Sequence, residues 1–291
     1  MRRLLIVGCG DVGLRLLGLV AKRYRVYALS RSDARDRQLR LHGAIPVRGD
    51  LDDASTLTRL SGIAEDVVHL APPPASGARD MRTSHLICSL ASASSLPQRL
   101  IYMSTTGVYG DCRDAWVDET RRTHPQTDRA RRRCDAERQL RAWTGVSGIR
   151  LSILRVPGIY AADRLPLERL RSGTPVLTAD ADPYTNHVHA DDLARAVVAA
   201  LARGRSGRVY NAVDFTEMRM GEYFDMVAQA FGLQVPPRVT LPEARRRLPP
   251  MLLSFMTESR RLHNRRLVEE LRFGFRYPTA RDGVLAALSQ Y

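Results

Sequence analysis

The chain has 291 residues, of which 44% are hydrophobic, and a formal net charge of +14 at pH 7. This length and hydrophobic share are enough for one sizeable core, with room for a smaller appended lobe. No stretch approaches the roughly 18 uninterrupted apolar residues of a membrane span, so the sequence predicts a protein that does not enter a membrane. Glycines and Asp11 interrupt the apolar N-terminal run, unlike a secretory signal, and we therefore expect a cytoplasmic protein.

The four cysteines, Cys9, Cys88, Cys112 and Cys134, show neither metal-binding pairs nor a dense disulfide pattern, which suits a reducing compartment. The positive charge raises the alternative of a nucleic-acid binder. However, the arginines are spread along the whole chain, and the densest run covers only residues 129–133. We interpret that run as a solvated helix face and do not expect a nucleic-acid partner. A positive surface would still attract small anions such as nucleotides.

The first motif is Gly8-Cys9-Gly10-Asp11-Val12-Gly13, between the apolar run 4–7 and the largely apolar segment 14–20. This pattern predicts a strand, a tight turn and a helix. The first glycine allows the sharp bend, the second lets the backbone approach a diphosphate, and the third lets helix and strand pack closely. Amides at the helix start would face the anion, helped by the helix dipole. We therefore predict that residues 8–13 bind a dinucleotide.

A second strand is expected over residues 24–30, and it runs into Ser30-Arg31-Ser32. In a dinucleotide-binding fold this strand end meets the adenosine ribose. An acidic residue there accepts from the 2′-hydroxyl of NAD, whereas an arginine accommodates the 2′-phosphate of NADP. Arg31 and its two flanking hydroxyls favour NADP. Asp33 lies close enough to keep NAD as the second choice, and an exposed loop arginine without a ligand is the remaining alternative.

Strands and helices continue to alternate through the first half of the chain. We expect helices over 34–42, 53–60 and 78–93 and strands over 44–47, 66–70 and 99–103. The fourth strand ends at Ala71 and three prolines, which cannot continue a ladder, at the edge where open parallel sheets bind ligands. The alternation predicts an α/β fold with a doubly wound parallel sheet. Further helices are expected at 165–170 and 220–231, with two more within 241–271, as a smaller C-terminal lobe.

Several motifs, in this order, resemble the extended short-chain dehydrogenase/reductases, that is, the NAD-dependent epimerase/dehydratase family. They are the glycine turn, Gly49-Asp50-Leu51, Ala71-Pro72 and the segment 104–110, followed by 154–160, 186–194, 209–214 and 276–279. The resemblance runs almost end to end and implies a Rossmann domain of residues 1–155 and 187–214. It implies a smaller substrate-binding lobe of residues 156–186 and 215–291. One residue instead of two between the first two glycines resembles the atypical branch of this family.

The resemblance also implies contacts to the cofactor beyond the glycine turn. These would come from Asp50, Leu51, Ala71, Pro72 and Pro157, with Pro157 beside the nicotinamide. Family catalysis uses a Ser or Thr together with a Tyr and a Lys that lie four residues apart on one helix face. The lysine lowers the pKa of the phenol, which exchanges a proton with the substrate.

Thr105 corresponds to the family's Ser or Thr, although a strand-end cap is an equal alternative. Alignment on Pro125 and Glu137 places Arg129 at the tyrosine position and Arg133 at the lysine position. Arg133 could replace the lysine as a cation near the ribose, but its planar fork reaches differently. Arg129 cannot replace the tyrosine, because a guanidinium with a pKa above about 12 releases no proton at neutral pH.

A proton carrier would have to come from elsewhere, and Tyr109, Tyr160 and His187 are the candidates. His187 and His189 lack a third ligand of matched spacing, so we expect no metal site. The sequence thus predicts an NAD(P)-binding oxidoreductase or epimerase-like enzyme that acts on a small anionic or nucleotide-linked substrate. The alternative is a non-catalytic sensor or scaffold that responds to NADP(H). A homodimer is compatible with the sequence.

Overall fold

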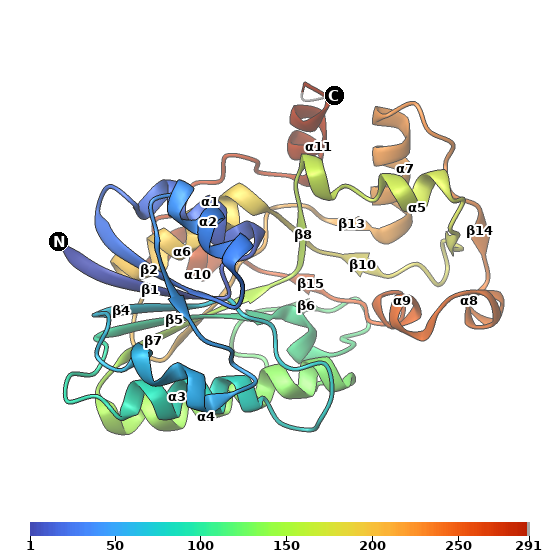
Figure 1. Ribbon diagram of the computed structural model, residues 1–291. Helices are drawn as coiled ribbons and strands as arrows, with labels where there is room; N and C mark the ends of the chain where they lie inside the picture. Colours follow the sequence, from blue (N-terminus) through green and yellow to red (C-terminus); the bar gives the residue numbers. More distant parts are fainter. Residues whose placement is uncertain (290–291) are drawn as a thin grey trace.

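The computed structural model describes residues 1–289 and is built around a seven-stranded parallel sheet (Figure 1). The strands lie in the order β12 (Arg208–Asn211), β7 (Arg150–Val156), β5 (Arg99–Thr105), β4 (Asp66–His69), β1 (Arg2–Val7), β2 (Tyr24–Ser30) and β3 (Ile45–Arg48). β1 therefore lies between β2 and β4, where the strand order reverses. Such a switch point is where open parallel sheets bind their ligands. The predicted doubly wound α/β fold is confirmed.

Helices cover both faces of this sheet. Figure 1 shows α1 (Asp11–Val20), α2 (Asp33–Leu41) and α6 (Ala190–Arg203) on one face, and α3 (Met81–Ala91) and α4 (Asp128–Ser147) on the other. Because successive side chains of a strand point to opposite faces, Leu4 and Ile6 join the core under α1 and α6, and Leu5 and Val7 join the other core. The continuous apolar run of β1 is thus the signature of a strand buried on both faces.

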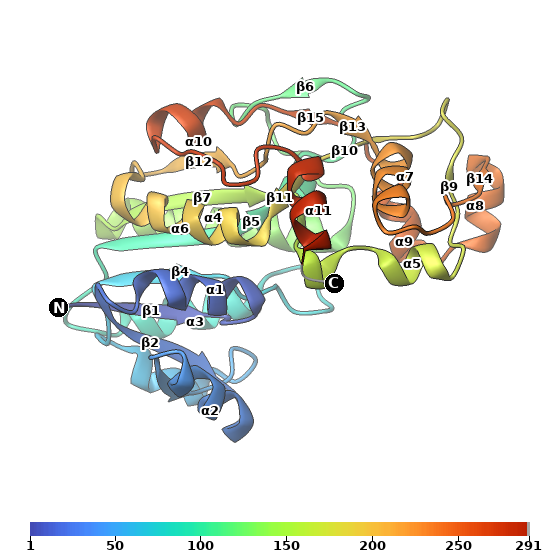
Figure 2. The same cartoon turned by 90° about the horizontal axis from the view of Figure 1, so that it is seen from above.

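A smaller group of elements lies at the carboxyl end of the sheet (Figure 2). It has its own hydrophobic cluster, which includes Tyr160, Leu170, Tyr223 and Val284. Its elements are β8 (Gly158–Tyr160), η3 (Ala162–Arg164), α5 (Leu167–Arg171), β9 (Val176–Leu177), β10 (Tyr184–Thr185), β11 (His187–His189), β13 (Met218–Arg219), α7 (Met220–Ala230), β14 (Arg238–Val239), α8 (Leu241–Arg247), α9 (Pro250–Phe255) and α11 (Ala280–Leu288). Three short elements complete the first half of the chain, namely η1 (Ala54–Leu60), η2 (Thr106–Tyr109) and β6 (Trp116–Val117).

The prediction of two helices within residues 241–271 is wrong. This stretch forms α8, α9, the short strand β15 (Arg261–Leu262) and a third helix, α10 (Arg265–Glu270). α8 ends at Arg247. The next residue, Leu248, is extended, because the helical conformation is disfavoured for a residue that precedes a proline. Leu267 and Leu271 then pack in the core under α1 and α6, so α10 lies against the sheet domain.

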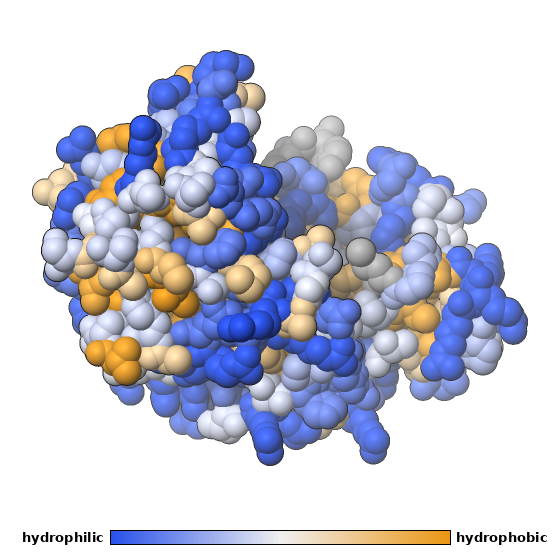
Figure 3. All heavy atoms as spheres, turned by 60° about the horizontal axis from the view of Figure 1, so that its bottom comes forward, coloured by the Kyte–Doolittle hydropathy of each residue, from blue (hydrophilic) through white to orange (hydrophobic). Residues whose placement is uncertain are grey.

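The surface shown in Figure 3 is mostly hydrophilic, with hydrophobic residues interspersed among charged and polar ones. Within residues 1–289, no helix combines the length and the apolar character needed to cross a bilayer.

Candidate functional site

The glycine turn joins β1 to α1 at the carboxyl edge of the sheet. Gly8 has a φ of +88°, and a Cβ atom added there would lie 2.4 Å from the backbone nitrogen of Ala71. A Cβ atom at Gly10 would instead have no neighbour within 4 Å. At Gly13 it would lie 3.0 Å from Cys9 Sγ. The first glycine thus lets two strand ends meet, the second leaves open space, and the third lets the helix pack onto the turn.

The start of α1 is open to an anion. Gly10 is its N-cap and provides no side-chain hydrogen bond to the first turn. The amides of Asp11, Val12 and Gly13 have no partner within the helix, since the first amides of any helix lack one. Burial raises the pKa of the Cys9 thiol to about 11, so Cys9 contributes its backbone and its packing. Uncapped amides, a helix dipole and free space above Gly10 fit the diphosphate of a dinucleotide.

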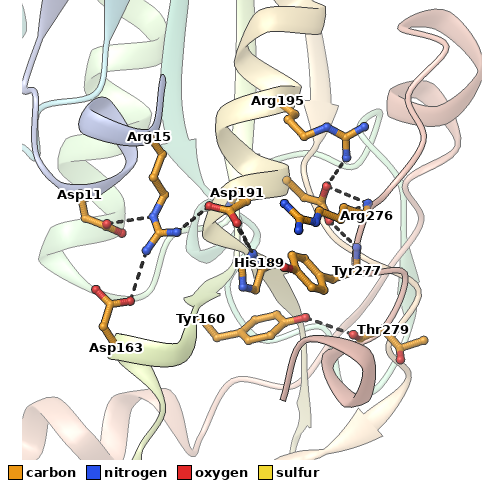
Figure 4. A network of polar contacts seen from close by, with 11 residues as sticks. Asp11, Arg15, Tyr160, Asp163, His189, Asp191, Arg195, Arg276, Tyr277 and Thr279 are labelled. Atoms are coloured by element: carbon orange, nitrogen blue, oxygen red, sulfur yellow. Dashed lines mark hydrogen bonds and ion pairs between the residues drawn. The ribbon is translucent and has the colours of Figure 1, made fainter. Parts of the chain in front are cut away.

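An arginine connects this turn to the segment that leads into the smaller lobe (Figure 4). Arg15 binds Asp11 at 2.9 Å (Nε to Oδ1), Asp163 at 3.2 Å and Asp191 at 2.5 Å. Arg164 in turn donates to Asp11 Oδ2 at 3.1 Å. Two arginines therefore contact the Asp11 carboxylate at the helix start, and Arg15 is shared with the carboxylates of Asp163 and Asp191. The sequence analysis did not find these ion pairs.

Three residues were predicted to contact the cofactor at the end of β2, namely Ser30, Arg31 and Ser32. The two serines stabilise the local structure, and the arginine is exposed. Ser30 is buried, and its hydroxyl donates to the carbonyl of Ser32 at 3.3 Å. Ser32 caps α2 by accepting from the amide of Arg35. Arg31 is exposed, with Nη1 3.7 Å from Asp50 Oδ2. A hollow of about 460 Å³ opens here, lined by Ser30, Arg31, Arg48, Gly49, Asp50, Ser55, Thr56, Thr58 and Arg59.

The acidic alternative for the ribose, Asp33, is paired with another group. Its carboxylate forms an ion pair with Arg48, which also binds Asp36 at 2.9 Å. Arg48 lines the same hollow as Arg31 and Arg59. Arg31 and Arg48 both lie beside carboxylates, whereas Arg59 forms no ion pair within residues 1–289.

The remaining predicted cofactor contacts follow the carboxyl ends of three strands of the sheet, β3, β4 and β7. The Asp50 amide donates to Thr56 Oγ1 at 2.8 Å, which fixes the turn after β3. Leu51 is buried, so its side chain belongs to the core beneath α3. Ala71 is buried and Pro72 exposed directly after β4, and Pro157 follows β7 half-buried.

Thr105 ends β5 and lies beside the start of α4. Its hydroxyl oxygen accepts from the amide of Gly107 at 3.2 Å, so it caps η2. An added Cβ on Gly107 would lie 3.5 Å from Thr105 Oγ1 and 3.9 Å from the Ala130 Cβ, which places the hydroxyl next to the first turn of α4. Because the oxygen serves as an acceptor in the cap, the cap does not use the hydroxyl proton.

Arg133, which the sequence analysis aligned with the family's lysine, is buried. Its Nη1 donates at the sheet edge, and its Nε has no hydrogen-bond partner within residues 1–289. Its Nη1 lies 3.1 Å from the carbonyl of Ala71, 3.0 Å from the hydroxyl of Tyr102 and 2.9 Å from the carbonyl of Met103. The guanidinium also lies over the Tyr102 ring at 5.6 Å. Arg133 thus ties α4 to the ends of β4 and β5.

The interpretation of residues 129–133 as a solvated face is wrong for Arg132 as well as Arg133. Arg132 is buried and donates to the carbonyls of Gly77 at 2.8 Å and Ala75 at 3.1 Å. The proline-rich loop after β4 cannot pair its carbonyls in a ladder, and these guanidinium groups satisfy them instead.

Arg129, which the sequence analysis aligned with the family's tyrosine, has an exposed side chain that makes no hydrogen bond or ion pair within residues 1–289. Partial desolvation and, after it, the like charge of Arg133 lower the pKa of Arg129. A guanidinium nevertheless stays charged at neutral pH. The helix therefore presents one unpaired cation near the strand ends.

Glu137 and Arg155 form a buried ion pair beneath this edge. Arg155 Nε and Nη2 contact the two carboxylate oxygens of Glu137 at 3.1 and 2.7 Å, and the hydroxyl of Ser104 donates to Glu137 at 2.6 Å. Arg155 also covers the ring of Tyr109 at 4.7 Å. The Tyr109 hydroxyl donates to Asn211 Oδ1 at 2.8 Å, so this tyrosine serves packing.

The other two candidate proton carriers are also buried. The Tyr160 hydroxyl donates to the carbonyl of Thr279 at 3.1 Å (Figure 4), and burial raises the pKa of this tyrosine. Burial lowers the pKa of His187 to about 3, and its ring stacks on Tyr223 with 4.1 Å between centroids. Burial also raises the pKa of Asp214 to about 7, a group that the sequence analysis did not single out.

Residues 4–212 match the sequence model of the NAD dependent epimerase/dehydratase family. The chain belongs to this family. Protein YeeZ of Escherichia coli strain K12 is 26% identical to this family member over 246 residues, which cover 81% of this chain and 86% of YeeZ. The predicted family membership is confirmed.

Solved structures agree with the fold. A conserved protein of unknown function from Silicibacter pomeroyi superposes on this epimerase/dehydratase family member with a TM-score of 0.84 at 29% identity, over 100% of this chain and 99% of its own. UDP-glucose 4-epimerase from Thermotoga maritima superposes with a TM-score of 0.79 at 17% identity, over 99% of this chain and 97% of the epimerase. The dTDP-glucose 4,6-dehydratase DesIV from Streptomyces venezuelae superposes with a TM-score of 0.79 at 22% identity, over 100% of this chain and 97% of DesIV.

Proposed function

We propose that this family member binds NADP in preference to NAD and acts as an oxidoreductase or epimerase-like enzyme on a small anionic or nucleotide-linked substrate. The main support is the uncapped start of α1 with free space above Gly10. Membership in an NAD-dependent family supports a nicotinamide dinucleotide as the ligand. The guanidinium groups at the end of β2 favour the form with the extra phosphate.

The residues around the strand ends suggest a division of roles. The nicotinamide, when bound, supplies hydride transfer. Thr105 would donate its free hydroxyl proton in a hydrogen bond to a substrate oxygen. Arg129, charged and without a partner in residues 1–289, would bind an anionic group of the substrate. Arg133 acts as a positioning residue that fixes α4 to the sheet. Neither arginine exchanges protons, so a proton would pass through water.

Removal of the Thr105 hydroxyl tests this assignment. We expect Thr105→Ala to lower kcat by about 100-fold with a reactive carbonyl substrate, because a donor that faces a developing oxyanion contributes roughly that factor. Steady-state kinetics with NADPH over sugar nucleotides and small keto acids would measure it, with calorimetry of NADP binding as the control. A variant with unchanged kcat would remove Thr105 from the reaction.

A second candidate function is a non-catalytic NADP(H) sensor. Two observations favour it. Arg133 Nη1 already donates to acceptors within the protein, and the candidate proton carriers Tyr109, Tyr160 and His187 are buried. A sensor would bind NADP without turning over any substrate of the panel, and NADP would raise its thermal stability by mass action. Turnover by the unmodified protein would exclude this candidate.

Cofactor choice depends on Arg31. We expect Arg31→Ser to weaken NADP binding by about 10- to 100-fold, the worth of a charge-assisted phosphate contact, and to leave NAD binding nearly unchanged. Calorimetry with both dinucleotides measures the ratio of the NADP and NAD affinities. Arg171→Ser, an exposed arginine in α5, is the control for net charge. Equal losses for NAD and NADP would contradict a role of Arg31 at the 2′-phosphate.

A further inference from the structure

A second hollow, of about 520 Å³, lies between α1, α6 and the segment that follows α10. Figure 1 shows these helices together on one face of the sheet. Residues 18–23 and 198–203, at the C-terminal ends of α1 and α6, form much of its lining. α1 starts at the glycine turn, so its far end places the hollow at the opposite edge of the sheet from the dinucleotide crevice.

Every titratable side chain that lines this hollow is basic, namely Lys22, Arg23, Arg195, Arg203 and Arg272. Two of the five have partners: Arg195 pairs with Asp192 at 2.5 Å, and Arg203 donates to the carbonyl of Leu271. The side chains of Lys22, Arg23 and Arg272 make no hydrogen bond or ion pair with the part of the chain that the structure describes. Lys22 is also the only lysine of the sequence. Three basic side chains without a partner among the described residues therefore line one hollow.

The walls of the hollow between these cations are apolar. They are formed by Leu19, Val198, Ala199, Ala202 and Phe273. Leu19 is 44% exposed and so offers apolar surface to a ligand in the hollow. A Cβ on Gly18 would meet nothing within 4 Å, so the hollow has room beside α1.

The backbone of Arg272 ends helix α10 in a left-handed turn. Its φ is +47°, in the region that glycine adopts without strain and other residues rarely adopt. The amide of Phe273 donates to the carbonyl of Val268 at 3.1 Å, as in a common type of helix end. This turn places the Arg272 side chain at the hollow.

We propose that the hollow binds a phosphate monoester that carries an apolar group. A phosphate monoester has a charge between about −1.5 and −2 at neutral pH, which matches the excess of unpaired cations. Its apolar part would contact Leu19, Val198 and Ala202, and the hollow has the size of a small-molecule site. This site is separate from the dinucleotide crevice and does not depend on the proposed function.

Calorimetry with three probes tests the proposal. Phenyl phosphate combines both features, inorganic phosphate has only the charge, and phenol has only the ring. We expect phenyl phosphate to bind at least tenfold more tightly than either fragment. The same affinity is expected in Gly10→Val, whose glycine turn is blocked, which separates this hollow from the diphosphate site. Loss of binding in Gly10→Val would overturn the proposal.

Arg272→Gly and Arg113→Gly form a matched pair of variants. Both remove an exposed arginine with positive φ, at +47° and +51°, but Arg113 does not line the hollow. We expect both variants to show a higher Tm, because glycine relieves the strain. Only Arg272→Gly should bind phenyl phosphate about tenfold more weakly, the loss expected for one charged contact.

Lys22→Gln should show the same tenfold loss with an unchanged Tm. Wild-type affinity in both Arg272→Gly and Lys22→Gln would overturn the proposal, as would equal losses in Arg113→Gly. Sedimentation with vesicles that contain phosphatidic acid tests the other source of the same head group. If vesicle binding is sensitive to Arg272→Gly and phenyl phosphate does not bind, the ligand of the hollow is a membrane surface and not a soluble molecule.

Discussion

Gly8→Ala is expected to destabilise the protein by about 3 kcal/mol or more, the range of severe backbone and packing conflicts. Two causes act together. The φ of +88° is strained for any residue with a side chain, and the new Cβ would lie 2.4 Å from the Ala71 nitrogen. β1 and β4 would have to separate at their carboxyl ends. Urea unfolding followed by circular dichroism would measure the loss, and dinucleotide binding should disappear with it.

Gly10→Val is the matched control, because its side chain meets no atom within 4 Å. Stability should fall by no more than about 1 kcal/mol, the usual cost of replacing a favourable N-cap. Binding of NADP should nevertheless fall at least 100-fold, since the side chain would fill the space above the amides of α1. Wild-type NADP affinity in Gly10→Val would show that the turn does not hold a diphosphate, and the proposed enzymatic function would fail with it.

Glu137→Leu is expected to cost about 3–5 kcal/mol of stability, the range measured when one partner of a buried ion pair is removed. Arg155 would remain buried with an uncompensated charge, and Ser104 would lose its acceptor. Both partners are almost inaccessible, with side chains 5% and 6% exposed, so the lost contact leaves the charge of Arg155 poorly solvated. Urea unfolding at pH 7 measures the change.

The double variant Glu137→Leu/Arg155→Met separates charge from packing. It should be more stable than Glu137→Leu alone, because two apolar groups leave no buried charge behind. If the double variant unfolds at a lower urea concentration than the single one, packing of Arg155 against Tyr109 outweighs its charge.

The fold could be predicted because its signals are local. The apolar run of β1, the three glycines and the alternation of strands with helices each occupy a short window. The boundaries of the elements are predicted less well from the sequence. The helix expected to start at residue 78 begins at Met81, because the Asp80 side chain accepts from the Thr83 amide and caps the helix. In residues 241–271, the strand β15 depends on pairing with β6, more than 140 residues earlier, and no local pattern indicates it.

The site was predictable to a smaller extent. Sequence order alone places Gly10, Arg31 and Thr105 at strand ends, which meet at one edge of a parallel sheet. The partners of charged residues depend on tertiary contacts instead. Arg15 meets Asp163 and Asp191 across 148 and 176 residues. Arg132 and Arg133 are buried only because a proline-rich loop brings unpaired carbonyls to them, so a charged run was misinterpreted as solvated.

The contrast between Arg129 and Arg133 has a consequence for divergence within the family. Arg133 serves Ala71, Tyr102 and Met103 at once, so a replacement at this position must satisfy three acceptors or loosen the helix. The Arg129 side chain makes no hydrogen bond or ion pair within residues 1–289. Residue 129 can therefore change with little effect on the scaffold. Under the proposed role of Arg129, such changes would alter substrate preference while the architecture stays the same.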